Sequence, residues 1–111
     1  MRYALHVTAA AERDIIDAAE YIEYVLLNPQ AAEDLLKAVE DTVSALAEQP
    51  LRIGRVSDPV LSAWGVRFIR VKNYLAFFVV DDETQRVMIF RFLYAKRNWM
   101  AILREKPAFD G

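Results

Sequence analysis

The chain has no cysteine and only one histidine, His6, among its 111 residues. The lack of cysteine excludes disulfides and thiolate-bound metals, and it favours a reducing compartment. One histidine cannot build a histidine metal cluster, and we expect His6, which lies on a predicted strand, to be structural and not part of a catalytic triad. The three glycines form no glycine-rich phosphate-binding loop. We therefore expect a protein that uses neither a metal nor a cofactor.

Long hydrophobic runs are also missing. No apolar stretch approaches the roughly 20 residues that cross a bilayer, and the first seven residues are too few and too polar for a signal peptide. A hydrophobic content of 55% with 27% charged residues is typical of a globular chain. We expect a single domain over residues 1–111, located in the cytoplasm and without a membrane partner.

The charges are divided unevenly along the chain. Residues 1–50 hold three basic and ten acidic residues, a net charge of −7, whereas residues 51–111 hold eleven basic and six acidic residues, a net charge of +5. Such a chain can present a basic face to a polyanion although its overall charge is −2. The simpler alternative is that the first half forms solvated acidic helices.

Two amphipathic helices are predicted in the first half. Thr8 is a favourable N-cap for the first helix, and Asn28-Pro29 both ends it and starts the second. Because the link is so short, the two helices must form an antiparallel hairpin. Apolar residues at three- and four-residue steps mark the two buried stripes, which are Ala11, Ile15, Ala18, Ile22 and Leu26, then Leu35, Val39, Val43 and Leu46.

Strands dominate the second half. A short strand at residues 2–7 precedes the helices, and residues 66–71, 74–80 and 86–94 alternate with a period of two and are rich in β-branched and aromatic residues. Residues 50–65 have no clear period, and a short helix is expected within residues 95–105. The order is β-α-α-β-β-β with a short C-terminal helix. We predict an α+β fold with the helical hairpin on one face of a mainly antiparallel sheet.

The turns set the strand register. Lys72-Asn73 as a tight turn places Arg67 opposite Phe78, and a loop at Asp81–Thr84 places Phe78 opposite Val87 and Tyr74 opposite Arg91. Alternation then puts Arg67, Tyr74 and Arg91 on one face, together with Ile69, Ala76 and Ile89. The face that we expect the helices to cover consists of Phe68, Leu75, Phe77, Met88, Phe90 and Phe92.

The predicted uncovered face carries two arginines and a tyrosine. Tyr94, Lys96 and Arg97 follow at the exit of the last strand. An arginine fork binds phosphate, and a tyrosine ring stacks on an unpaired base. The pattern therefore indicates a groove for single-stranded RNA or another phosphate-bearing target. The alternative is that these residues are ordinary solvent-exposed positions of a half-covered sheet.

Several short segments follow one another in a characteristic order. The most specific is Leu93–Trp99, which reads Leu-Tyr-Ala-Lys-Arg-Asn-Trp. The others are Ala11–Ile15, Tyr21-Ile22, Asn28–Ala32, Leu46 with Pro50, Gly65–Arg67, Asn73-Tyr74 and Val80-Asp81. From Leu5 to Leu103 the chain resembles the RelE/ParE superfamily, the toxin halves of type II toxin–antitoxin pairs, which include plasmid stabilisation proteins.

The resemblance implies two different activities. RelE-like members cut messenger RNA in the ribosomal A site without a metal, and ParE-like members poison DNA gyrase. It also implies a cognate antitoxin as the partner, with a segment that folds as it wraps the toxin. The second partner would be mRNA on the ribosome in the first case and DNA gyrase in the other.

For cleavage, the resemblance implies a set of basic groups that stabilise charge on the scissile phosphate while the RNA 2′-hydroxyl attacks it. Arg67 and Arg91 would bind the phosphate, and Arg97 would stabilise the transition state. Proton transfer or base stacking would fall to Tyr94 or Lys96. The remaining RNA contacts would come from Tyr74 and Arg70.

The chain departs from the RNA-cutting pattern at two positions. Leu75 follows the hairpin tyrosine where the best-known cutters carry an arginine, and Leu103 stands roughly where they carry a terminal tyrosine. Arg97 does match their basic residue after the last strand. An mRNA endoribonuclease is our first hypothesis from the sequence. The alternatives are a ParE-like gyrase inhibitor and a degenerate toxin that only binds its antitoxin.

Overall fold

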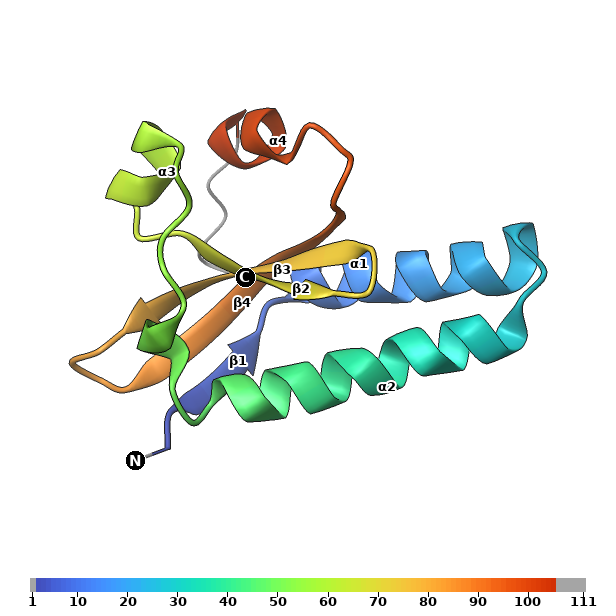
Figure 1. Cartoon of the computed structure of the whole chain (residues 1–111), viewed down its shortest axis with the longest axis horizontal. Helices are drawn as coiled ribbons and strands as arrows, with labels where there is room; N and C mark the ends of the chain where they lie inside the picture. The colour runs from blue at the N-terminus through green and yellow to red at the C-terminus, as the bar shows by residue number, and fades with distance from the viewer. Residues whose placement is uncertain (1, 106–111) are drawn as a thin grey trace.

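The computed structural model describes residues 2–105, in which a four-stranded sheet is packed between helices (Figure 1). The strands are β1 (Ala4–Val7), β2 (Arg67–Val71), β3 (Tyr74–Asp81) and β4 (Arg86–Tyr94). They lie in the order β1-β4-β3-β2, with β1 parallel to β4 and the other neighbours antiparallel. The predicted α+β class, element order and mainly antiparallel sheet are confirmed.

The two long helices begin at the predicted caps. The Thr8 side chain accepts a hydrogen bond from the Ala11 amide at the start of α1 (Ala9–Glu20), and Asn28 does the same for Ala31 in α2 (Pro29–Leu46). Both caps satisfy N–H groups that have no partner inside the helix. Figure 1 shows the two helices as an antiparallel hairpin that extends well beyond the sheet. No helix in residues 2–105 is long and apolar enough to cross a membrane.

The tip of the hairpin is a π-helical turn, η1 (Tyr21–Val25), which continues α1 directly. It closes with a hydrogen bond from the Leu26 amide to the Tyr21 carbonyl, and Leu27 then reverses the chain with a φ of 55°. A wider turn shifts the phase of the side chains relative to an α-helix. Leu26, which we predicted to end the buried stripe, is 56% exposed as a result.

Residues 50–65 contain two short helices, η2 (Pro50–Arg52) and α3 (Pro59–Ala63). The Asp58 side chain caps α3 by accepting a hydrogen bond from the Leu61 amide, and it also forms an ion pair with Arg104 of α4 (Trp99–Glu105). The predicted C-terminal helix is confirmed, and at its start the Asn98 side chain accepts a hydrogen bond from the Ala101 amide over 3.5 Å. Asp58 thus joins α3 and α4 into one layer.

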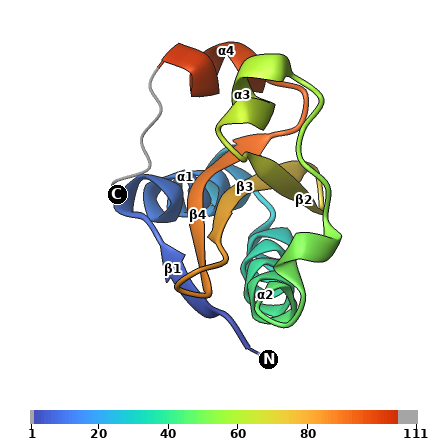
Figure 2. The ribbon, with the colours of Figure 1, turned by 90° about the vertical axis from the view of Figure 1, so that its left-hand side faces the viewer.

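Both faces of the sheet are covered by helices, which corrects the predicted arrangement (Figure 2). The hairpin packs on the face that holds Ile69, Ala76 and Ile89, the face predicted to be bare. The face with Leu75 and Phe77 packs against α3 and α4 instead. A sequence period of two assigns the residues of a strand to its two faces, but it does not identify which helices cover each face. When both faces of a strand are buried, both faces are apolar, so hydrophobicity does not distinguish them either.

The register between β2 and β3 is as predicted, with Arg67 opposite Phe78. The register between β3 and β4 is not, because Phe78 lies opposite Ile89 and not Val87. The cause is Asp81, which belongs to β3. Its carboxylate accepts hydrogen bonds from the Glu83 and Thr84 amides in the turn. The loop therefore starts one residue later than predicted, and the pairing moves by two.

A second irregularity moves the end of β4. The register shifts between Phe77 and Phe78, so that Tyr74 lies opposite Tyr94 and not the predicted Arg91. One extra residue on one strand re-aims the side chains that follow it. Phe92 consequently joins the hairpin side of the core, not the side that we predicted for it.

Candidate functional site

A groove of about 820 Å³ lies between the helical hairpin and the end of the sheet where β3 begins and β4 ends. The hairpin contributes Asp14, Asp17 and Tyr21 to its walls. The sheet side contributes Tyr74, Tyr94 and Arg97. The groove thus combines aromatic rings with two carboxylates and one guanidinium.

Stacked rings form the sheet side of the groove. Tyr74 lies nearly parallel to Phe92 at a centroid distance of 5.0 Å, and it meets Tyr94 edge-on at 5.6 Å. Burial raises the pKa of the Tyr74 phenol, and Tyr94 and Tyr21 act in the same direction. A phenol with a raised pKa stays protonated near neutral pH, so Tyr74 can donate a hydrogen bond or stack but is a poor general base.

Arg91 is held by a carboxylate of α1. Its Nε and Nη2 donate to the two oxygens of Asp14 over 2.7 Å and 3.2 Å, and Asp14 also accepts from the Phe92 amide over 3.0 Å. The Arg91 side chain is 25% exposed and that of Asp14 17%. A bidentate pair of this kind neutralises the arginine and occupies the Nε–Nη2 edge of its guanidinium.

Arg67 lies away from the groove, at the start of β2. Its guanidinium donates to the backbone carbonyl of Ile53. Burial lowers the pKa of Arg67, and the neighbouring charge of Arg55 acts in the same direction. In the strand register Arg67 aligns with Ile89, and Tyr94 is five residues further along β4, roughly 16 Å away at about 3.3 Å per residue.

The other predicted residues are exposed. Arg70 is on β2 and its Nε donates to the carbonyl of Lys72 over 3.0 Å. Lys96 and Arg97 follow β4 in a turn that closes with a hydrogen bond from the Arg97 amide to the Tyr94 carbonyl. Of the seven predicted site residues, the structure therefore gathers three around the groove, namely Tyr74, Tyr94 and Arg97.

Sequence reasoning missed the acidic wall of the groove. Neither Asp14 nor Asp17 was predicted from the sequence to be a site residue, yet both line the groove. A signal for Asp14 existed, because it lies three residues after Ala11 and four before Ala18, inside the apolar stripe of α1. A carboxylate on that stripe needs a partner. Within residues 2–105, no three His, Asp or Glu side chains gather so that they could hold a metal ion.

The fold is similar to those of several solved toxins. The chromosomal ParDE system of Pseudomonas aeruginosa contains a chain that is 21% identical, with 86% of this chain and 98% of that chain aligned at a TM-score of 0.69. A mutant of Escherichia coli RelE in the free state aligns over 97% and 99% of the two chains, with 17% identity and a TM-score of 0.62.

A third structure is the RelBE2 toxin–antitoxin complex of Mycobacterium tuberculosis. Its matching chain is 24% identical and aligns over 85% of this chain and 99% of that chain, with a TM-score of 0.59. Among curated proteins, a sequence search finds no match. A family model does match, over residues 5–99, and its description is the ParE toxin of the type II toxin–antitoxin system parDE. The chain therefore belongs to the ParE toxin family of type II toxin–antitoxin systems.

Proposed function

We propose that this toxin inhibits DNA gyrase in the manner of ParE-like proteins and does not cut mRNA. The observation that carries the proposal is the Asp14–Arg91 pair. An arginine that stabilises a scissile phosphate does so through its positive charge, whereas the charge of Arg91 is already paired with Asp14 through Nε and Nη2. To bind RNA there, Arg91 would have to exchange one anionic partner for another.

The charge of the groove supports the same conclusion. Asp14 and Asp17 line one wall, and Arg97 is the cation on the other. A polyanion entering this groove meets two carboxylates, of which Asp14 is neutralised by Arg91 and Asp17 forms no ion pair within residues 2–105. Electrostatic stabilisation of a cleavage transition state requires converging cations. A protein surface with mixed charge suits this groove better than RNA does.

The proposed antagonist of the toxin is a cognate antitoxin. The Pseudomonas and Mycobacterium structures to which the fold is similar are toxin–antitoxin systems. Apolar side chains at the hairpin tip, including Tyr24, Val25 and Leu27, are more than half exposed. Large exposed apolar patches mark protein interfaces. A segment of the antitoxin that folds on binding would cover such surface.

The test measures both candidate activities on the same toxin. The chain is induced alone in a bacterial host, and the SOS-type DNA-damage response and the 5′ ends of mRNA are recorded together. Purified toxin is then added to purified gyrase and relaxed plasmid. We expect growth arrest, an SOS response, inhibition of supercoiling, and no new mRNA ends at codon boundaries. A Phe77→Asp variant, which would bury a charge in the core and is expected not to fold, controls for the burden that expression itself places on the host.

Two results would overturn the proposal. Cleavage of mRNA at codon boundaries without DNA damage would restore the endoribonuclease. Continued growth with soluble, folded toxin in the cell would favour a degenerate toxin that only binds its antitoxin.

A further inference from the structure

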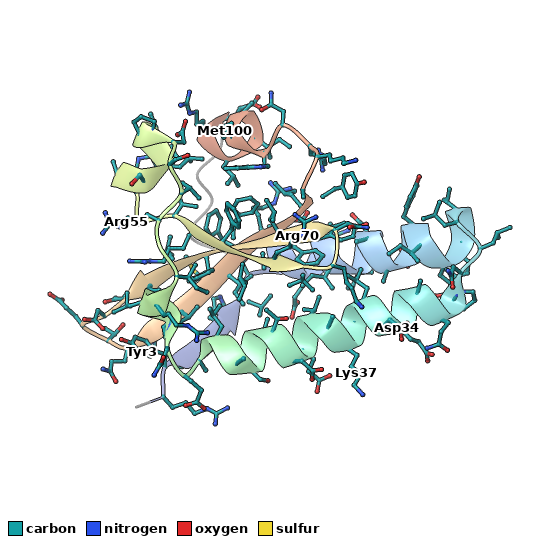
Figure 3. All side chains as sticks on the ribbon, in the orientation of Figure 1. Tyr3, Asp34, Lys37, Arg55, Arg70 and Met100 are labelled. Atoms are coloured by element: carbon teal, nitrogen blue, oxygen red, sulfur yellow. The ribbon has the colours of Figure 1, made fainter. Side chains whose placement is uncertain are left out.

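Five basic side chains follow the outer edge of the sheet. We call them the β2-edge strip, and its members are Arg52, Arg55, Arg67, Arg70 and Lys72. Arg67 is half-buried on the hairpin face of β2, Arg70 is on the opposite face, and all members except Arg67 are exposed, so the strip straddles the edge. β2 is the last strand in the order of the sheet. The segment before α3 runs along its start, because Arg55 forms an antiparallel bridge with Arg67 and the Val56 amide donates to the Val66 carbonyl. Figure 3 shows Arg55 beside the start of β2 and Arg70 farther along the strand.

The charge of the strip is uncompensated. Within residues 2–105 the three ion pairs involve Arg2, Arg91 and Arg104, and no member of the strip. Three members do donate hydrogen bonds, but each donates to a neutral backbone carbonyl: Arg55 to Ser62, Arg67 to Ile53 and Arg70 to Lys72. Arg55 and Arg67 lie opposite each other in the bridge, and like charges in such positions repel one another unless an anion lies between or beside them. The strip is therefore suited to a polyanionic partner.

The shape of the strip favours a duplex backbone over single strands. From Arg67 to Lys72 the strand spans roughly 16 Å at about 3.3 Å per residue. Duplex DNA of that length carries about nine charges, at one charge per about 1.7 Å, and arginine forks match phosphate oxygens. Sites for single strands add aromatic rings on which bases stack. Those rings, Tyr74 and Tyr94, line the groove instead.

The acidic hairpin does not prevent such binding. Its carboxylates are spread along α1 and α2, and Figure 3 shows Asp34 on the outer side of α2, away from β2. The protein measures 43 × 32 × 22 Å. At 0.1 M salt, exposed charges more than about 10 Å apart are largely screened. Screening at this salt therefore weakens the repulsion between bound phosphates and those carboxylates of the hairpin that lie more than about 10 Å from the strip.

We propose that the β2-edge strip binds the phosphate backbone of duplex DNA, so that the toxin contacts both gyrase and the DNA that gyrase holds. This inference rests on the proposed function for the identity of the polymer. The strip would then strengthen binding to the gyrase–DNA assembly relative to gyrase alone.

The test measures DNA binding without gyrase. Fluorescence anisotropy follows a labelled 20-base-pair duplex titrated with purified toxin at 50 and 200 mM KCl. Four phosphate contacts, one from each exposed member of the strip, give a slope of about −3.6 in log K against log salt, a loss of roughly 150-fold over this range. The variant Arg52→Gln/Arg55→Gln/Arg70→Gln keeps one exposed contact, from Lys72, and its loss should fall to roughly 3.5-fold. The matched variant Arg13→Gln/Lys37→Gln/Arg86→Gln removes three exposed charges elsewhere and should behave like the wild type.

Several outcomes would overturn the inference. The first is no binding of duplex at 50 mM KCl, and the second is equal behaviour of the two triple variants. A third is tighter binding of single-stranded RNA or of polyglutamate than of duplex DNA. Because gyrase inhibition is scored separately, the two proposals can fail independently. A toxin that binds DNA through the strip but leaves gyrase active would overturn only the proposed function.

Discussion

Asp14 and Arg91, which are 77 residues apart in the sequence, are joined by two hydrogen bonds between α1 and β4. The same carboxylate accepts the Phe92 amide just beyond the point where the β3–β4 register shifts. One side chain therefore ties the helical hairpin to the irregular part of the last strand. The pair stabilises the contact between α1 and β4. It also neutralises the positive charge of Arg91 within the protein.

Removing this carboxylate should destabilise the protein. The pair is about four-fifths buried, and breaking a fully buried pair costs about 3–5 kcal/mol, so we expect Asp14→Asn to lower the free energy of unfolding by about 2 kcal/mol in urea titrations. Asp17→Asn, three residues along α1 and without an ion pair among the described residues, should change it by less than about 0.5 kcal/mol. Equal effects of the two substitutions would show that the pair contributes little.

The Tyr94 hydroxyl should not be needed for growth arrest. Tyr94→Phe removes only the phenolic oxygen and keeps the ring that meets Tyr74 edge-on. If the toxin acts by binding gyrase, its inhibition of supercoiling should change by less than about threefold. A general acid or base contributes typically about 10²–10⁴-fold to a reaction rate. A loss of that size in the folded variant would return Tyr94 to the catalytic set and argue for RNA cleavage.

Acid should weaken the contact between α3 and α4. The hydrogen bond from Arg104 lowers the pKa of Asp58 below its ordinary value of 3.8, and the Leu61 amide acts in the same direction. A lowered folded-state pKa means that the stabilisation is present above pH 3.8 and is lost as the pH falls through the lower folded value. The melting temperature of the wild type should therefore exceed that of Asp58→Asn at pH 6, and the difference should shrink below pH 3.8. A difference that is constant from pH 6 to pH 2.5 would contradict this assignment.

The second layer of helices should be as important to the core as the hairpin. Phe77 is fully buried and contacts Trp99 of α4 at a centroid distance of 5.1 Å and Phe68 at 5.7 Å. Phe77→Ala should cost about 3–5 kcal/mol of unfolding free energy, and Phe77→Leu clearly less, because more of the cavity stays filled. Tryptophan fluorescence during unfolding reports the loss of this contact directly. A cost below about 1 kcal/mol would mean that α4 is only loosely packed.

Local features of this fold could be predicted from the sequence. Thr8 and Asn28 cap helices by contacts with residues three positions away, and the Lys72-Asn73 turn joins two adjacent strands. Each depends on a few neighbouring residues, so the pattern contains the necessary information. The same holds for the apolar stripes that form the hairpin.

The arrangement of the arginines could not be predicted in this way. Arg67, Arg91 and Arg97 were expected to converge on one bare face, but they belong to the sheet edge, the α1 contact and the groove, respectively. Their positions depend on a side chain 77 residues away, on the turn at Asp81 and on a one-residue register shift. None of these leaves a periodic signal in the sequence.

The place of β4 in the sheet has a consequence during synthesis. The last strand of the chain lies between the first strand and β3, and Ala4 meets its partner Arg86 only after 82 residues. On the ribosome, the hairpin emerges long before the strand on which it packs, and such distant pairing delays folding. A chain released early from a broken message lacks the centre of its sheet. The complete sheet, and with it the groove at the end of β4, can therefore form only when translation of the chain is nearly finished.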